Sequence, residues 1–312
     1  MDVLSDVLSR AHARGALFGR WLLSAPWGLE FDDGQLPLSL HTVLSGELTC
    51  EREGSAARVR QGDLVLVQGG RYRFVHAPGA AAQPVSAVLA AGPAPGTPRT
   101  YLLGGAGHHT ELLCGAYAFD GGLWPALLAT LPEVTVVGSA GDRSLSTLLA
   151  LLAEEIRGGG PGQQTVLDRL LDLLLVAALR VHWSAAGTAA PGWFSALSDP
   201  VAGPALHALH EEPARSWTIA DLAERAGVSR ATLARRFSLL MGQPPLAYLT
   251  GWRMELAKDA LENTGVTLAS VARTVGYADE FSFAAAFKRE VGIAPGRYRT
   301  RRSVPGAAPQ GA

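Results

Sequence analysis

The apolar positions between Trp217 and Tyr298 form one pattern that occurs twice, at an offset of about 50 residues. In each copy, apolar residues recur at spacings of three and four, stop at a glycine, and resume in a longer segment. Four pairs hold equivalent positions: Phe237 and Phe287, Gly242 and Gly292, Pro245 and Pro295, Tyr248 and Tyr298. A repeat of this size predicts two copies of one structural unit.

Each copy predicts a helix-turn-helix. Gly227 and Gly276 end the short first helix, because glycine adopts the left-handed conformation at little cost. Ser229 and Asp279 follow as N-cap residues of the second helix. The apolar period of that helix predicts these buried positions: Leu233, Phe237 and Leu240 in the first copy, Phe283, Phe287 and Val291 in the second. This is the layout in which a second helix enters the major groove of DNA.

The N-terminal third shows a different pattern, with short strand-like runs separated by glycine-containing turns. These runs are 38–44, 47–51, 57–60 and 64–67. Many short strands with regular turns favour a small β-barrel or sandwich. Before them, Leu4, Val7, Leu8 and His12 suit one face of a short helix, and the Gly- and Pro-rich stretch 92–98 is typical of a loop.

From Gly122 the pattern becomes helical, and we expect helices over 123–131, 144–157 and 165–183. Their apolar residues occupy more than one face, so they need a cover, which is either the barrel or a second copy of the chain. The run Val166–Trp183 contains charged residues and therefore favours a buried or partner-facing helix over a membrane span.

Composition adds an asymmetry of charge. The chain has 312 residues, enough for two domains. Up to Pro204 there are 13 Lys and Arg against 18 Asp and Glu, whereas from Ala205 onward there are 14 against 10. The excess of positive charge therefore lies in the half with the repeats, as contact with phosphates requires. Two cysteines and an N-terminus without a long apolar core fit a cytoplasmic protein.

The repeat region resembles the tandem helix-turn-helix domain of AraC/XylS-type transcription regulators. The matching residues include Val275-Gly276-Tyr277, Phe281-Ser282-Phe283, Ala286 to Arg289 and Pro295 to Arg299. The N-terminal runs, with His41-x-Val43-Leu44-x-Gly46 and Gly62 to Val67, resemble the cupin barrel of many such regulators. The resemblance implies an α+β multidomain chain, with an N-terminal cupin-like β-barrel with helices and a C-terminal all-α tandem helix-turn-helix domain.

We expect five segments in this chain: a sensor barrel over 1–120, a helical dimerisation segment over 121–184, a linker over 185–204, the DNA-binding domain over 205–301 and a disordered tail over 302–312. Helix packing is expected to resume near 199–212.

The DNA-binding residues follow from the helical period and from the resemblance. On the first recognition helix the outward positions are Arg230, Ala231, Ala234 and Arg235. Arg235 is the strongest base-reading candidate, since its guanidinium matches N7 and O6 of guanine. On the second recognition helix the candidates are Phe281, Ser282 and Ala285, although Phe281 also suits a place partly in the core. The predicted phosphate contacts are Arg236, Arg253, Lys288, Arg289 and Arg297, and each is open to an ordinary surface or ion-pair role.

The barrel is the candidate sensor of a small-molecule effector. Its pocket candidates are Trp27, His41, Tyr72, Arg73 and His76, for which barrel packing is the alternative. The histidines do not make the ligand set of a metal-binding cupin, so we expect neither a metal nor a cofactor. Cys50 and Cys114 are candidates for oxidant sensing, although Cys114 lies in an apolar run typical of a packed core thiol.

The resemblance implies a transcription regulator that binds double-stranded promoter DNA and responds to an effector, with RNA polymerase as a further partner and activation as the expected outcome. It also implies a homodimer through the helices of the sensor domain, for which the candidate surface comprises Leu148, Leu152, Leu167, Leu170, Leu171 and Leu174. Two alternatives stay open: a metal-dependent cupin enzyme with a helical interaction domain, and an interaction protein that has lost DNA binding. The acidic Asp279 and Glu280 at the second recognition helix do not exclude the latter.

Overall fold

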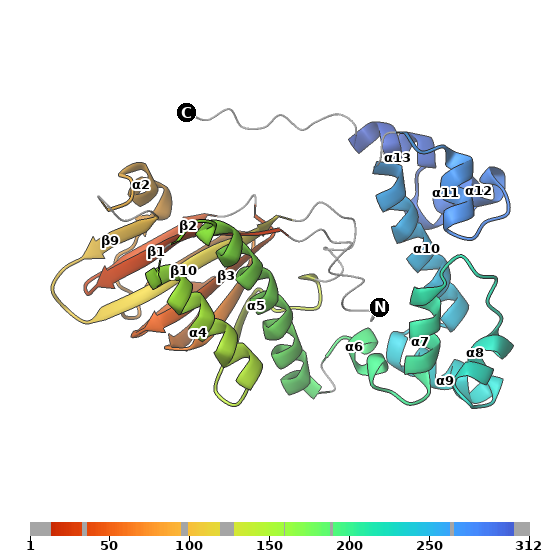
Figure 1. Ribbon diagram of the computed structural model, residues 1–312, viewed down its shortest axis with the longest axis horizontal. Coiled ribbons are helices and arrows are strands. Elements are labelled where there is room, and N and C mark those ends of the chain that lie inside the picture. Colours follow the sequence, from red (N-terminus) through yellow and green to blue (C-terminus); the bar gives the residue numbers. More distant parts are fainter. Residues whose placement is uncertain are drawn as a thin grey trace. The chain divides into compact units, whose positions relative to one another are not determined.

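The computed structural model describes residues 14–32, 36–94, 99–118, 128–158, 160–187, 190–262 and 265–302. The chain folds into two compact units. The first contains all the described strands and two long helices and ends at Ala186, and the second begins at Gly187. Figure 1 shows the strands in the first unit and only helices in the second. None of the described helices is long and apolar enough to cross a membrane.

Two β-sheets build the first unit. The six-stranded sheet has the order β11-β6-β3-β10-β1-β9, and the five-stranded sheet has the order β5-β4-β7-β2-β8. The bounds are β1 Arg14–Ser24, β2 Gly28–Asp32, β3 Leu38–Ser45, β4 Glu47–Arg52, β5 Ser55–Arg60, β6 Asp63–Gln68, β7 Arg71–Val75, β8 Gln83–Pro84, β9 Thr100–Gly104, β10 His109–Ala118 and β11 Val134–Gly138. The four predicted strand runs are confirmed as β3 to β6.

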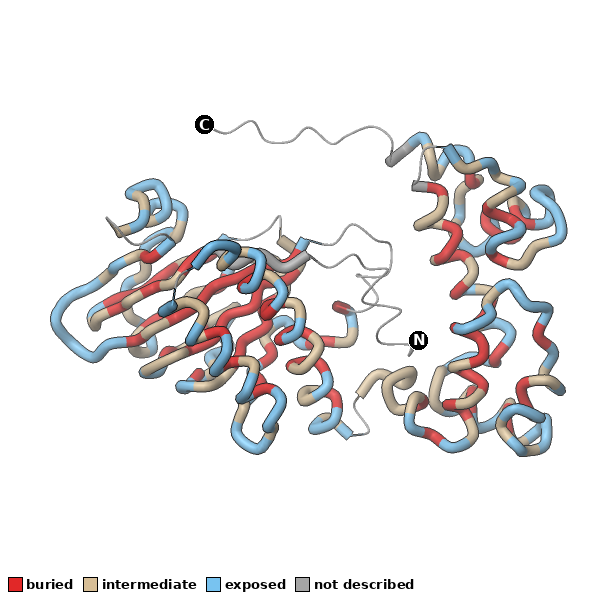
Figure 2. Tube along the Cα trace, viewed as in Figure 1, coloured by how far each residue is buried: buried red, intermediate tan, exposed pale blue. Residues whose placement is uncertain are grey.

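The core of this unit receives side chains from both sheets. Trp21, Val43 and Leu112 come from the six-stranded sheet, and Leu29 and Phe74 come from the five-stranded one; all five belong to one buried cluster. Figure 2 shows the buried positions concentrated along the strands. Each fully buried aliphatic or aromatic side chain contributes about 1.5–3 kcal/mol. This core holds the two sheets together, as expected for a small barrel or sandwich.

Two helices of this unit, α4 (Arg143–Gly158) and α5 (Gln163–Ala186), pack against each other, and α5 packs on β1 (Figure 1). The hydroxyl of Tyr117 in β10 donates to the carbonyl of Leu171 at 2.5 Å, which fixes α5 to the sheet. The predicted dimer surface is corrected here, because the packing inside this unit covers nearly all of it. Leu152, Leu167, Leu170, Leu171 and Leu174 are buried, and Leu148 is half-buried.

The prediction of a helical segment over 121–184 is wrong in part, because a strand, β11, lies within it. The β-branched run of β11 pairs antiparallel with β6, with Val136 opposite Val65. A short helix, α2 (Val85–Ala90), was not predicted. The helix expected over 123–131 lies largely outside the described residues, and so do the N-terminal helix with Leu4, Val7, Leu8 and His12, and the tail after Arg302.

The second unit consists of helices. They are α6 (Gly192–Leu197), α7 (Ala202–Glu211), α8 (Ile219–Arg225), α9 (Arg230–Met241), α10 (Pro245–Glu262), α11 (Leu268–Thr274), α12 (Glu280–Val291) and α13 (Pro295–Arg302). The predicted linker 185–204 is too long, because α6 and the start of α7 lie within it. Ala196 and Ala202 are fully buried in the same cluster as Phe237. These helices are therefore part of the packed unit and not a connection.

Candidate nucleic-acid interface

The first helix-turn-helix consists of α8 and α9. Thr218 caps α8, since its hydroxyl accepts from the backbone N–H of Asp221, whose carboxylate accepts from the N–H of Thr218. Gly227 has φ +65° in the turn, a conformation that favours glycine. The Ser229 hydroxyl then accepts from the N–H of Thr232 at 3.2 Å and begins α9. The predicted glycine stop and serine cap are both confirmed.

The second helix-turn-helix repeats this layout in α11 and α12. The hydroxyl of Thr267 caps α11 through the N–H of Ser270, and Gly276 has φ +81° in the turn. Asp279 caps α12 as predicted, with its Oδ1 accepting from the N–H groups of Phe281 and Ser282, each at 2.8 Å. The hydrogen bond from the backbone N–H of Ser282 is the largest cause that lowers the pKa of the Asp279 carboxyl, so it stays ionised at neutral pH.

The ends of the two motifs match in detail. Gly242 and Gly292 both adopt the left-handed conformation at the C-caps of α9 and α12. The ring of Tyr248 lies edge-on to that of Phe237 with centroids 5.8 Å apart, and Tyr298 lies in the same way to Phe287 at 5.6 Å. The sequence repeat is therefore a repeat of contacts, because each tyrosine closes the core of its own motif.

On α9, one face is buried and the opposite face is exposed. Leu233 and Phe237 are buried, whereas Arg230, Ala231 and Arg235 are exposed and Ala234 is half-buried. These are the orientations that the helical period predicts. Leu239 is 71% exposed and lies four residues after Arg235, so the two share a face. Leu239 is absent from the predicted set, although the same period points to it, and an apolar side chain there suits contact with a thymine methyl group.

On α12, the outward residues are Phe281, Ser282 and Ala285. Phe281 is 80% exposed, so the alternative of a partly buried ring is wrong for this residue. The hydroxyl of Ser282 donates to the carbonyl of Asp279 at 3.0 Å, which leaves its oxygen as an acceptor. The exposed Glu280 adds negative charge beside this face. The exposed face of α12 therefore offers few side chains of a kind suited to reading bases.

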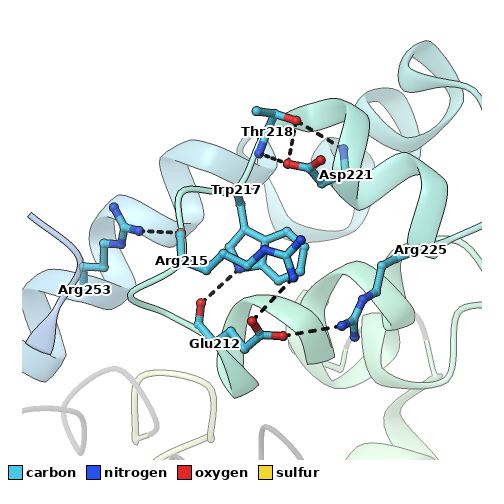
Figure 3. A network of polar contacts seen from close by, with 7 residues as sticks. All are labelled: Glu212, Arg215, Trp217, Thr218, Asp221, Arg225 and Arg253. Carbon is cyan, nitrogen blue, oxygen red and sulfur yellow. Dashed lines mark hydrogen bonds and ion pairs between the residues drawn. The ribbon is translucent and has the colours of Figure 1, made fainter.

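Two of the five predicted phosphate contacts are bound to distant parts of the protein. Arg236 binds the carboxylate of Asp199 through Nη2 at 2.6 Å and Nε at 2.8 Å. Arg253 donates to two backbone carbonyls before α8, as Figure 3 shows for the one at Arg215. The sequence missed both partners because they lie 37 to 40 residues away. Lys288, Arg289 and Arg297 are exposed, and Arg289 also pairs with Glu290 at 2.9 Å.

Asp199 holds α9 and α7 together. Burial opposes ionisation of its carboxyl, but hydrogen bonds from Arg236 and from the backbone of Ala202 and Val201 outweigh that effect and lower the pKa. Its Oδ1 accepts from both backbone N–H groups at the start of α7, at 2.8 and 3.0 Å. The helix that carries Arg235 is therefore fixed against α7.

The effector-pocket residues do not line one pocket. His41 and Tyr72 are buried, with His41 Nε2 2.8 Å from the Tyr72 hydroxyl, and the rings of Phe31 and Phe74 pack around them. Trp27 is also 3% exposed. Burial lowers the pKa of His41 to about 3, so the ring is neutral. This part of the prediction is corrected, since these three side chains belong to the core.

Arg73 follows Tyr72 on β7 and points to the other face of the strand, because side chains alternate. It pairs with Glu51 at 3.2 Å and donates to the carbonyl of Ala80. His76 Nδ1 lies 2.7 Å from the carbonyl oxygen of Trp27. Arg73 therefore holds the loop after β7, and His76 connects the start of that loop to Trp27.

The burial of the two cysteines argues against the hypothesis that they sense oxidants. Cys50 and Cys114 are not joined in a disulfide, and they are 2% and 1% exposed. Burial raises the pKa of Cys50 to about 12, which disfavours the reactive thiolate. Both positions are core positions instead of accessible sensing thiols. Among the described residues, no three or more His, Cys, Asp or Glu side chains are grouped so as to hold a metal ion.

Known proteins match both units. Residues 2–184 match a cupin family, and residues 222–301 match a helix-turn-helix domain family. An AraC-like transcription regulator of Streptomyces lividans is 35% identical over 98% of this chain and 100% of its own length, and one of Streptomyces antibioticus is 34% identical over 96% and 98%. The crystal structure of the DNA-binding domain of AdpA in complex with a target DNA is similar to 35% of this chain and all of that chain, at 31% identity and a TM-score of 0.33.

Proposed function

We propose that α9 and α12 bind two successive major-groove segments of one promoter, since this chain belongs to the AraC-like transcription regulators. One observation carries this proposal. A capped helix with an exposed face occurs twice in the same compact unit, as α9 and as α12. Two recognition helices in one unit address sites about one helical turn apart, about 34 Å along the duplex.

The two helices have unequal roles in this proposal. Arg235 reads a guanine by two parallel hydrogen bonds, while Ala231, Ala234 and Leu239 offer apolar surface to thymine methyl groups. Phe281, Ser282 and Ala285 contribute less to sequence recognition, and α12 mainly positions the protein on the backbone. Lys288, Arg289 and Arg297 supply the exposed positive charge for phosphates. Arg236 and Arg253 hold the fold together instead.

The experiment is a selection of genomic fragments by the purified full-length protein, followed by footprinting of the bound site. Two protected segments about one turn apart on one face of the duplex are expected. Random duplex is expected to bind more weakly, with an affinity that falls as salt rises. A footprint confined to one groove segment, or equal affinity for selected and random duplex, contradicts the proposal.

The same premise gives the first unit a sensor role. Instead of the buried aromatic cluster, the site we propose for a small effector is a pocket of about 270 Å³ between the sheet and the start of α5. Arg20, Arg99, Thr100, Gln163, Gln164 and Leu167 are among its lining residues. Arg20 and Arg99 bring guanidinium groups to this lining, and Arg20 also pairs with Glu111 at 2.7 Å. The two glutamine amides and the leucine add neutral polar and apolar surface. A small anionic effector with an apolar part suits this lining.

Thermal unfolding in the presence of a panel of aliphatic and aromatic carboxylates tests this site. A ligand is expected to raise the melting temperature of the wild type and to do so less in Gln164→Glu, which adds a negative charge to the pocket. Gln61→Glu adds the same charge at an exposed position away from the pocket and serves as the control. An equal shift in both variants places the ligand elsewhere.

We also propose a homodimer through α4 and α5. Val166 and Leu173 are 43% and 52% exposed and lie seven residues apart on α5, so they share a face, and Leu151 on α4 is 46% exposed. These residues replace the buried leucines as the candidate surface. Leu173→Glu is expected to give monomers in sedimentation analysis, while Leu239→Glu in the other unit leaves the dimer intact.

The outcome at the promoter is proposed to be activation through RNA polymerase in the cytoplasm. Transcription in vitro with purified polymerase, with and without the protein, tests this directly. An increase in transcript from the footprinted promoter supports activation, and a decrease identifies a repressor.

A further inference from the structure

Residues 213–217, between α7 and α8, lie against α10. The side chain of Arg253 on α10 donates from Nε to the carbonyl of Pro213 at 2.7 Å and from Nη2 to the carbonyl of Arg215 at 2.8 Å. Figure 3 shows Arg253 reaching across to this segment. A guanidinium has donors in a fixed fork, so two carbonyls on one segment fix both its position and its direction.

The turn of the second motif touches the same segment. A Cβ atom on Gly276 would lie 2.4 Å from the carbonyl oxygen of Ala214 and 2.7 Å from its Cα. The backbone of the second motif therefore contacts the backbone that leads into the first. Gly227 is the equivalent glycine of the first motif, and a Cβ there would meet no atom within 4 Å. The two copies differ at this point, so the contact at Gly276 belongs to the junction between them.

Each side of this junction is anchored in a core. On one side, Trp217 is buried in the first motif, and its indole N–H donates to the carbonyl of Glu212 at 3.0 Å (Figure 3). On the other side, the guanidinium of Arg253 lies 5.8 Å from the ring centroid of Tyr277, whose ring packs edge-on against Phe283 at 5.8 Å. Phe283 belongs to α12, so the chain of contacts reaches the second recognition helix.

The helix that joins the motifs has a weak point beside this junction. Gly251 lies inside α10, two residues before Arg253, and glycine in a helix costs about 1 kcal/mol relative to alanine. A connection through α10 alone would allow the motifs to bend or twist about this point. The contacts of Arg253 and Gly276 provide a second connection across it.

We infer that Arg253, with Pro213, Ala214, Arg215, Gly276 and Tyr277, is a positioning junction that sets the distance and rotation between α9 and α12, and so selects operators of one spacing. This inference rests on the proposed binding of two groove segments. It gives Arg253 no contact with DNA, because Nε and Nη2 donate to the backbone carbonyls of Pro213 and Arg215. Loss of the Arg253 side chain is expected to remove the penalty in binding affinity for a wrongly spaced operator.

The test uses the full-length protein and its footprinted operator, with base pairs inserted or deleted midway between the two protected segments. One base pair rotates the second segment by about 35° and moves it by about 3.4 Å. For the wild type, a one-base-pair change is expected to weaken binding about tenfold or more, whereas for Arg253→Ala the change is about twofold. Arg253→Lys is expected to behave like Arg253→Ala, because an ammonium cannot reproduce the fork.

These variants separate the junction from a phosphate contact. If Arg253 bound phosphate, Arg253→Lys would keep the affinity, and Arg253→Ala would weaken all spacings equally and reduce the salt slope by about 1. A sharp spacing preference in both variants overturns the junction alone, while the proposed function stands. A wild type without spacing preference overturns the proposed two-groove binding, and the junction with it.

The glycines supply a matched pair. Gly276→Ala and Gly227→Ala both place a Cβ atom at a residue of positive φ, +81° and +65°, but only the first forces Ala214 away. We expect Gly276→Ala to broaden the spacing profile as Arg253→Ala does, and Gly227→Ala to retain the wild-type profile. Equal profiles in the two glycine variants, with both proteins folded by circular dichroism, contradict the junction.

Discussion

The carboxylate of Asp199 binds the guanidinium of Arg236 at 2.6 Å, across 37 residues of sequence. The same carboxylate accepts two backbone N–H groups at the start of α7. One buried acidic side chain thus fixes both the first turn of α7 and the side of α9 next to its exposed face with Arg235.

Replacing Asp199 is expected to loosen this arrangement. Asp199→Ala removes the helix cap and the ion pair and should lower the free energy of unfolding by about 2 kcal/mol. Asp199→Asn keeps an acceptor for the cap and should cost about half as much. The expected loss is modest because the side chain of Arg236 is 45% exposed to solvent. Urea unfolding measures both, and an equal loss in the two variants contradicts a separate contribution of the helix cap.

The pH dependence of this contribution follows from the lowered pKa of Asp199. The unfolded carboxyl takes up its proton near pH 3.8, before the folded one does. The stabilisation is therefore complete above that pH and is lost only as pH falls through the lower pKa of the folded state. Between pH 5 and pH 8, Asp199→Asn and the wild type should differ by a constant amount.

His41 is expected to make the first unit sensitive to acid. Its pKa is about 3 in the folded state against 6.5 in the unfolded chain, so the unfolded state binds more protons between these values. Stability is therefore complete above pH 6.5 and falls by about 1–2 kcal/mol between pH 7.5 and pH 5. His41→Gln, which can still bond to Tyr72, should remove this loss in urea unfolding. The exposed His108→Gln should retain it, and an unchanged slope in His41→Gln contradicts the assignment.

Arg235→Ala is expected to weaken operator binding by about 1–3 kcal/mol and to relax the preference at one base pair. Arg169→Ala removes an exposed arginine of the first unit and should change neither quantity. Competition binding against operators substituted at each position measures both effects. An Arg235→Ala protein with the wild-type base preference would falsify the base-reading role.

The two cysteines are expected to be inert in the folded protein. Both are buried, and burial raises the pKa of Cys50 to about 12. Iodoacetamide should leave both thiols unmodified in native buffer and alkylate them in denaturant, as peptide mass analysis shows. A double variant, Cys50→Ala with Cys114→Ala, should bind its operator normally before and after mild oxidant. Rapid alkylation of the native protein would restore the sensing hypothesis.

The sequence by itself determined the local features of this protein. The two helix-turn-helix motifs, the caps at Ser229 and Asp279, the glycine turns and the strands β3 to β6 all follow from neighbours within a few residues. Such signals survive in the sequence because a cap, a turn or a helical face needs only its own segment. The outward positions of Arg230, Ala231 and Arg235 follow for the same reason.

Only the tertiary structure decided which side chains meet across long stretches of chain. It paired Arg236 with Asp199 and Arg253 with the carbonyls before α8, and it buried the leucines of α5, the two cysteines and the ring of His41. An arginine that binds phosphate and an arginine that holds a distant loop have the same kind of sequence neighbours. Their difference arises from packing, where burial and the cost of an unpaired polar group select the partner.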